Sequence, residues 1–232
     1  MVMNMKENQQ EKNIFLSASM AESRPSLLDS LAHNGIVRAV QAISQAYKGD
    51  EPIYCIDATA GNGHDTCFLA GIGNFVQGDF SVLACDVQKE ALQSTRERLK
   101  FHGLQAELVH SGHENITGYL PKQCVLAGVM FNLGYLPRKD RKNDFIATKA
   151  ETSVPAIANC CERLYPQGVI SVHCYTGHAG GLEEYHAIHD FAAALDPKLW
   201  RVLCVSDVNR EHTLEYLFFM EKLQIKQKRA VC

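Results

Sequence analysis

The chain alternates short apolar runs with longer segments whose apolar residues recur at helical spacing. The short runs are almost continuously apolar, which is typical of strands buried on both faces, so the pattern predicts a parallel sheet covered by helices on both sides. The expected helices cover residues 26–48, 65–71, 89–102, 113–120, 150–164 and 181–195. The expected strands are Ile53–Ala58, Ser81–Asp86, Ala106–His110, Val125–Asn132, Val169–Tyr175, Val202–Val208 and Leu214–Glu221.

The pattern changes at the end of the chain. Only residues 209–213 separate the last two expected strands, which is too short for a crossover helix, so we expect these strands to pair antiparallel. Five parallel strands followed by an antiparallel hairpin resemble the seven-stranded, Rossmann-like sheet of class I methyltransferases. We expect one such domain over 26–222, after a flexible N-terminal arm at 1–25 and before a basic tail at 223–232.

Composition excludes several classes of protein. Of 232 residues, 46% are hydrophobic, which is enough for a core and excludes wholesale disorder. A net charge of -3 excludes a strongly basic nucleic-acid-coating protein but allows a local basic patch. No apolar run approaches the roughly 18 residues of a membrane span. Lys6 and Glu7 interrupt the N-terminus where a signal peptide would be apolar, so we expect a cytoplasmic location.

The nine cysteines do not predict disulfides or a metal site. Their number is odd, and no pair has the C-x-x-C spacing of a zinc or redox motif. Cys55, Cys85, Cys174 and Cys204 lie in apolar runs, where a free thiol behaves as a small buried hydrophobe. The apolar helix at 26–48 can cover the sheet or a partner subunit, so a homodimer is compatible with the sequence.

A glycine-containing turn follows the first expected strand. Gly61 and Gly63 allow the backbone to turn tightly and approach a ligand at the start of the next helix. Asp86 ends the next strand, where its carboxylate can accept hydrogen bonds from ribose hydroxyls. The turn therefore predicts a nucleotide-type cofactor, although a lone G-x-G is also found in ordinary strand–helix turns.

Two cofactors compete for this turn. A dinucleotide fold requires a third glycine, but this chain has Thr66 there. Asp57 stands at the end of the strand, where its carboxylate would lie near the ligand and repel phosphates. S-adenosylmethionine has no phosphate and carries a sulfonium and an amino group, so the charges favour it over NAD.

The end of the fourth strand carries a second group of polar residues. Asn132 offers an amide oxygen to an amine, Gly134 keeps the backbone close to a ligand, and the ring of Tyr135 can stack on a base. This segment resembles the N/D-P-P-Y/F motif of amino-methylating enzymes, and a strand-terminating turn is the alternative. Arg138 and Lys139 follow in a basic loop that can bind phosphates or simply be solvated.

Histidines form two further groups. His113 and Ser111 follow the third strand, where class I enzymes usually contact adenine. His178 lies in a glycine-rich segment after the fifth strand, on the expected substrate side. His173, His178, His186 and His189 lack a neighbouring carboxylate–Cys pattern, so we expect no metal site.

Several motifs occur together in a fixed order. They are DAT-x-GNG-x-DT at 57–66, Asp86-Val87-Gln88, SGHENI at 111–116, NLGYLP at 132–137, TKAET at 148–152 and Y-x-GH-x-GG at 175–181. This set, spread between about residues 30 and 222, is similar to the YtqB-type family of class I methyltransferases, which carries the label rRNA methylase.

The resemblance implies an S-adenosylmethionine-dependent methyltransferase. Members of the family methylate the exocyclic amine of 5-aminomethyl-2-thiouridine at the tRNA wobble position (the MnmM activity), so tRNA is the expected partner and rRNA the alternative. The expected catalytic residues are Asn132, Tyr135 and His113. The expected cofactor-binding residues are Asp57, Thr59, Gly61, Asn62, Gly63, Asp65, Thr66, Asp86, Gln88, Ser111, His113 and Asn132. The expected substrate-binding residues are Leu133, Gly134, Tyr135, Arg138, Lys139 and His178.

Three other functions remain compatible with parts of the sequence. A small-molecule methyltransferase agrees with the negative net charge. An NAD-dependent oxidoreductase agrees with the sheet but not with Thr66 and Asp57. A non-catalytic binding module could share the fold, although the polar residues at the strand ends are those of an enzyme.

Overall fold

The computed structural model describes residues 26–134, 146–210 and 214–224, and all its strands join one sheet. The strand order is β3-β2-β1-β4-β5-β7-β6. As expected, the first five strands are mutually parallel and β7 pairs antiparallel with β6. β7 also pairs antiparallel with β5. The strands are β1 (Ile53–Asp57), β2 (Phe80–Asp86), β3 (Glu107–His110), β4 (Val125–Leu133), β5 (Leu164–Tyr175), β6 (Trp200–Val205) and β7 (Glu215–Lys222).

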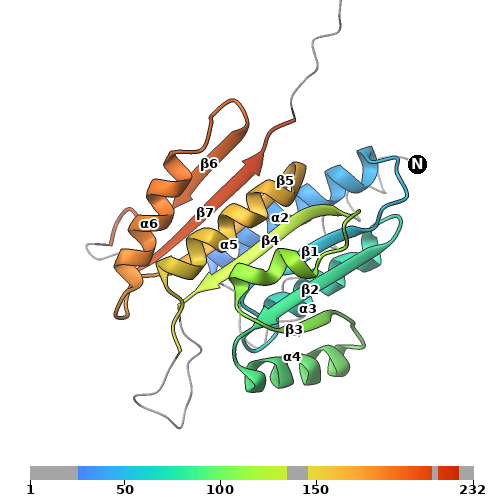
Figure 1. The fold of residues 1–232 in the computed structure, drawn as a ribbon, viewed down its shortest axis with the longest axis horizontal. Coiled ribbons are helices and arrows are strands. Elements are labelled where there is room, and N and C mark those ends of the chain that lie inside the picture. Colours follow the sequence, from blue (N-terminus) through green and yellow to red (C-terminus); the bar gives the residue numbers. More distant parts are fainter. Residues whose placement is uncertain (1–25, 135–145, 211–213, 225–232) are drawn as a thin grey trace, which may run out of the picture.

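Helices cover both faces of this sheet. In Figure 1, α5 lies in front of the central strands and α6 lies at the β7–β6 end of the sheet, whereas α2 and α3 lie behind the sheet. The predicted class I methyltransferase architecture is therefore confirmed. The helices are α2 (Leu27–Ala46), α3 (His64–Ile72), α4 (Lys89–His102), α5 (Ala150–Arg163) and α6 (Gly181–Ala193), with the 3-10 helices η1 (Gly73–Phe75) and η2 (His113–Tyr119).

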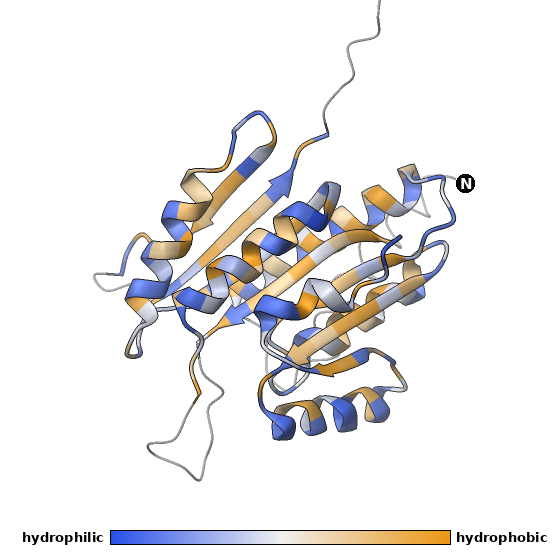
Figure 2. Cartoon of the chain, in the orientation of Figure 1, coloured by the Kyte–Doolittle hydropathy of each residue, from blue (hydrophilic) through white to orange (hydrophobic). Residues whose placement is uncertain are grey.

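The core has one large hydrophobic cluster on each side of the sheet. Ile56 of β1 packs with Ile157 of α5 and Ile188 of α6 on one side, and Cys55 packs with Ile36 of α2 on the other. The strand residues alternate between these clusters because successive side chains point to opposite faces. Figure 2 shows the central strands as mainly hydrophobic, which is what a sheet buried on both faces requires.

The first helix covers the sheet of its own chain. α2 begins with a capping box, in which the Ser26 hydroxyl accepts from the Asp29 N–H and the Asp29 carboxylate accepts from the Ser26 N–H. Ile36, Val40 and Ile43 are buried against the sheet. Of the two uses expected for this helix, covering the sheet is thus the one observed.

The edge strand differs from the prediction. β6 is Trp200–Val205 rather than Val202–Val208, so the connection to β7 is longer than expected. Cys204 was expected to be buried, and this is wrong: its side chain is exposed. β6 pairs only with β7 at the edge of the sheet, and Leu203 is exposed there as well. Within the described part of the chain, no helix is both long and apolar enough to cross a membrane.

Candidate active site

A cavity of about 790 Å³ opens at the carboxyl ends of β1, β2, β4 and β5. This is the edge at which open α/β sheets bind their ligands. Three expected site residues, Tyr135, Arg138 and Lys139, lie outside the described residues. Twelve of the others line the cavity: Thr59, Gly61, Asn62, Asp65, Asp86, Gln88, Ser111, His113, Asn132, Leu133, Gly134 and His178.

Asp57, Gly63 and Thr66 support the cavity from behind and are not among its lining residues. Asp57 is 2% exposed, and its carboxylate accepts hydrogen bonds from the Thr59 N–H (3.1 Å) and the Thr66 hydroxyl (2.5 Å). Burial raises the pKa of Asp57, and the negative charge of Asp65 raises it further. The turn folds over the Asp57 carboxylate and uses it as an internal hydrogen-bond acceptor, so its contact with the cofactor stays a prediction.

Gly63 allows the turn to pack closely against α4. It has a φ of +80°, and a Cβ atom built on it would lie 2.7 Å from the Cα of Thr95. The Thr95 hydroxyl donates to the carbonyl of Gly61 at 3.1 Å. A side chain at position 63 would separate these two segments, so the second glycine shapes the turn through packing.

Asp86 joins the end of β2 to the glycine turn. Its Oδ2 accepts from the Gly61 N–H at 3.0 Å, and its Oδ1 accepts from the Gln88 N–H at 2.8 Å. Each carboxylate oxygen has a second lone pair. The Asp86 carboxylate is thus held in place by the backbone and can still accept two hydrogen bonds from a ligand.

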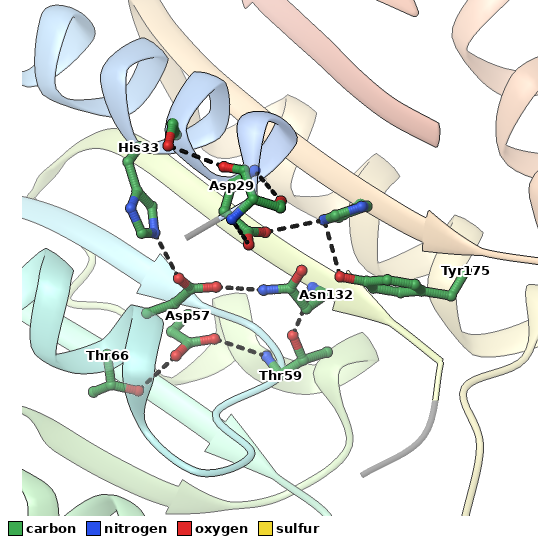
Figure 3. A network of polar contacts seen from close by, with 11 residues as sticks. Asp29, His33, Asp57, Thr59, Thr66, Asn132 and Tyr175 are labelled. Carbon is green, nitrogen blue, oxygen red and sulfur yellow. Dashed lines mark hydrogen bonds and ion pairs between the residues drawn. The ribbon is translucent and has the colours of Figure 1, made fainter. Parts of the chain in front are cut away.

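Asn132 is bound to α3 and to the glycine turn at once. Its backbone N–H donates to the Thr59 hydroxyl at 2.8 Å, and its side-chain nitrogen donates to Asp65. The other oxygen of Asp65 contacts Nε2 of His33, on α2, at 2.7 Å. Figure 3 shows His33, Asn132, Thr59 and Asp57 along this hydrogen-bonded network.

Glu184 is a buried carboxylate that anchors the wall beside Asn132. It is 2% exposed and accepts from the hydroxyls of Ser153 (2.6 Å) and Thr148 (2.8 Å). The Thr148 hydroxyl in turn accepts from the Gly134 N–H at 2.8 Å. Burial raises the pKa of Glu184. α6 therefore fixes the backbone at the end of β4 through Thr148.

His113 lies on the η2 side of the cavity. Its Nε2 contacts the hydroxyls of Thr152 (3.2 Å) and Ser153 (3.4 Å), and its ring meets Phe131 edge-on at 5.9 Å. Burial lowers the pKa of His113, so the neutral ring is favoured. The neutral imidazole can serve as a hydrogen-bonding wall or accept a proton.

Tyr175 lines the cavity at the end of β5. Its hydroxyl lies 3.2 Å from Nδ1 of His173, and the two rings stack at 4.3 Å. His173 is flanked by carboxylates, Asp29 at 3.4 Å and Glu215 at 3.5 Å. The hydrogen bond to His173 lowers the pKa of Asp29 to about 2. Figure 3 shows Asp29 reaching from α2 toward Tyr175.

Sequence reasoning missed the contribution of α2 and α6. Asp29 and His33 lie one turn apart on α2, and their spacing within an apolar helix was the available signal. Glu184 has the acidic neighbours Glu183 and Asp190 on α6, so nothing in the sequence distinguished it from a solvent-exposed charge. Among the described residues, no three His, Cys, Asp or Glu side chains are grouped as metal ligands would be.

The cavity fits S-adenosylmethionine. Its volume is within the usual range of roughly 300–1,000 Å³ for small-molecule sites. Of the described residues that line it, Asp65, Asp86, Glu114 and Glu215 are acidic, and Lys149 is the one lysine. This charge balance favours a ligand with a sulfonium and an amino group over one with two phosphates.

The strand order, the glycine turn after β1 and the acidic end of β2 define a class I, S-adenosylmethionine-dependent methyltransferase. A family model described as "Putative rRNA methylase" matches residues 82–221. The chain belongs to this rRNA methylase family. The sequence-based prediction of family, enzyme class and cofactor is thus confirmed.

Known relatives agree with this assignment. A protein of Arabidopsis thaliana, named as a chloroplastic tRNA (mnm(5)s(2)U34)-methyltransferase, is 31% identical over an alignment of 188 residues that covers 75% of this chain and 64% of that protein. A putative methyltransferase from Streptococcus mutans, solved in complex with SAH, has 30% identity and a TM-score of 0.70 over 86% of this chain and 99% of its own. A putative rRNA methylase from Clostridium thermocellum has 31% identity and a TM-score of 0.67, covering 82% of this chain and 97% of its own.

Proposed function

We propose that this enzyme methylates a primary amine on an RNA nucleoside, with 5-aminomethyl-2-thiouridine at the tRNA wobble position as the acceptor. The observation that carries the proposal is the orientation of the Asn132 side chain. An ionised carboxylate only accepts hydrogen bonds, so the amide turns its nitrogen to Asp65 and its oxygen away from it. Asn132 lines the cavity, and an amide oxygen is suited to accept an N–H from an amine.

The charges around Asn132 support an amine substrate. Asp65 and Glu215 line the same cavity, and Asp29 lies behind it, beside His173. An alkylamine is largely protonated at neutral pH, and carboxylates attract the ammonium form into the site. When the substrate binds, its amine then lies near groups that accept hydrogen bonds, namely these carboxylates and the Asn132 amide oxygen.

The residues of the chain have three tasks in this reaction. S-adenosylmethionine, when bound, supplies an electrophilic methyl group. Asn132 orients the amine through its oxygen, and Tyr175 forms a wall of the cavity at the end of β5. The amine must lose a proton before its lone pair can attack. The neutral ring of His113 lines the cavity and can take up this proton.

The choice of RNA rests on the relatives. The Arabidopsis protein is named for the tRNA nucleoside proposed here, and the family model carries the description rRNA methylase. The chain spans 64% of the length of the Arabidopsis protein, so its substrate is transferred as part of this proposal. An rRNA nucleoside and a small-molecule amine are the alternatives. The cytoplasmic location also stays a prediction, since the Arabidopsis relative is named as chloroplastic.

The decisive experiment is nucleoside mass spectrometry. The protein is incubated with isotopically labelled S-adenosylmethionine and total tRNA from cells that lack its gene. We expect the label in 5-methylaminomethyl-2-thiouridine. Label in a different RNA nucleoside would replace the proposed acceptor while keeping the methyltransferase assignment. An absence of label from all RNA, with S-adenosylhomocysteine still bound, would favour a small-molecule substrate.

Salt dependence separates an RNA from a small neutral acceptor. Binding through phosphates releases counterions, so the affinity for tRNA should fall steeply between about 50 and 200 mM salt. The affinity for S-adenosylhomocysteine, measured in the same buffers, should change much less and serves as the control. Equal salt dependence for the two ligands would argue against phosphate contacts.

A further inference from the structure

His33 connects the first helix to the active site. It lies on α2, and its Nε2 is 2.7 Å from Oδ1 of Asp65. Its ring stacks on Phe68 of α3, with ring centroids 3.7 Å apart. The side chain is only 12% exposed, and its Nδ1 is buried without a hydrogen-bond partner among the described residues. Such a position costs stability compared with an apolar residue, which suggests a role beyond packing.

The contacts of Asp65 explain how this role reaches the cavity. One carboxylate oxygen is bonded to His33 and the other to the amide nitrogen of Asn132. A carboxylate held at one oxygen cannot rotate freely about its side-chain bond. The bond from His33 therefore fixes the direction from which Asp65 meets the Asn132 amide.

The amide of Asn132 has two possible orientations that differ by a half-turn. With the Asp65 carboxylate fixed, only one of them places a donor against an acceptor. The alternative orientation would bring two oxygens together and would present an N–H group in place of the oxygen to a ligand. That reversed orientation would repel the N–H of an amine.

We propose that His33 is a positioning residue which, through Asp65, keeps the Asn132 amide oxygen directed at the amine acceptor. This inference rests on the proposed function, since it concerns the same acceptor nitrogen. Through His33, α2 would contribute to the choice of methyl acceptor. The Asn132 oxygen that His33 keeps in place favours a nucleophile that donates a hydrogen bond. Asp86, an expected cofactor-binding residue, lies on β2 and is held by the Gly61 N–H rather than by His33.

Two substitutions distinguish the effect of the His33–Asp65 hydrogen bond from that of the His33 ring stacking on Phe68. His33→Phe keeps a ring that can stack on Phe68 but has no donor for Asp65. His33→Gln has no ring but keeps an N–H donor at a similar distance from the backbone. The same two substitutions at His186, which is exposed on α6, are the matched controls.

Methyl transfer to tRNA is measured for each variant, with kcat and KM determined separately. We expect His33→Phe to lower kcat about 10- to 100-fold, because a misplaced reacting group has an effect of that order. Its affinity for S-adenosylhomocysteine and its melting temperature should remain close to those of the unchanged protein. His33→Gln should recover most of kcat. Full activity of His33→Phe, or a greater loss in His33→Gln than in His33→Phe, would overturn the inference.

A measurement without the RNA keeps the test independent of the proposed function. The ¹H–¹⁵N signals of the Asn132 side-chain amide are assigned by their loss in Asn132→Asp. We expect slow exchange of the amide proton with water in the unchanged protein and in His33→Gln, and faster exchange in His33→Phe. Identical exchange in all three would overturn the positioning role. If the unchanged protein showed this protection but did not methylate tRNA, the proposed function would fail and the positioning of Asn132 would stand.

Discussion

The Gly61 N–H donates to Oδ2 of Asp86 across 3.0 Å, joining the glycine turn after β1 to the end of β2. These residues are 25 positions apart in the chain, but the parallel pairing of β1 and β2 brings their strand ends to the same edge. The bond orients the carboxylate before a ligand arrives. A preorganised acceptor loses little entropy on binding, so this pair should matter for cofactor affinity.

Asp86→Asn tests the role of this carboxylate. An amide has one oxygen, so it can no longer accept from both the Gly61 and the Gln88 N–H groups. We expect the affinity for S-adenosylhomocysteine, measured by calorimetry, to fall about 10- to 100-fold, which corresponds to the ~1.5–3 kcal/mol of hydrogen bonds to charged groups. Asp79→Asn, at an exposed position just before β2, should have no effect. Unchanged affinity in Asp86→Asn would remove Asp86 from the cofactor site.

Gly63→Ala tests the close packing of the turn on α4. The added Cβ would overlap the Cα of Thr95, which belongs to the helix backbone and cannot move alone. Gly103→Ala is the matched control, because Gly103 also has a positive φ (+65°) but has open space around it. Both variants should be destabilised by about 1–2 kcal/mol through the backbone conformation. Overlap should cost Gly63→Ala about 1–3 kcal/mol more, measured by chemical denaturation. Equal losses in the two variants would contradict the packing argument.

Glu184 should make the stability of the protein depend on pH. Because burial raises its pKa in the folded state, the folded protein retains this proton at pH values where the unfolded chain has lost it. The contribution of Glu184 to the free energy of unfolding is therefore greatest below about pH 4 and falls as the pH rises through the folded-state pKa. In Glu184→Gln this fall should be absent, so stability should decrease less with pH than in the unchanged protein. The neighbouring exposed Glu183→Gln should leave the pH profile unchanged.

Asn132→Ala tests the acceptor side of the site. The substitution removes the oxygen that is proposed to receive the amine, but it keeps the backbone bond to Thr59. We expect kcat for methyl transfer to fall on the order of 100-fold, with nearly unchanged affinity for S-adenosylhomocysteine. Asn209→Ala, at an exposed position, is the control. A large loss of cofactor affinity with normal kcat would instead move Asn132 into the cofactor site.

Much of the candidate site was predictable because the residues that line its cavity follow strand ends. Asp86 and Asn132 stand at the ends of apolar runs, Gly61 lies in the turn that follows another, and parallel strands end at the same edge of the sheet. The direction in which a side chain points was harder to predict from the sequence. Asp57 ends β1 like the other strand-end residues, but its carboxylate is enclosed by Thr59 and Thr66.

The sequence alone determined the order of strands and helices along the chain, the antiparallel end of the sheet and the edge at which the cavity opens. These properties follow from local periodicity, connection length and strand direction, which are all encoded over short stretches of chain. Only the tertiary structure decided that His33 contacts Asp65 and that Glu184 holds Thr148. Those pairs are 32 and 36 residues apart, and each depends on how a helix docks on the sheet. Docking is determined by the packing of whole apolar faces, so no local pattern could reveal which polar residues would meet.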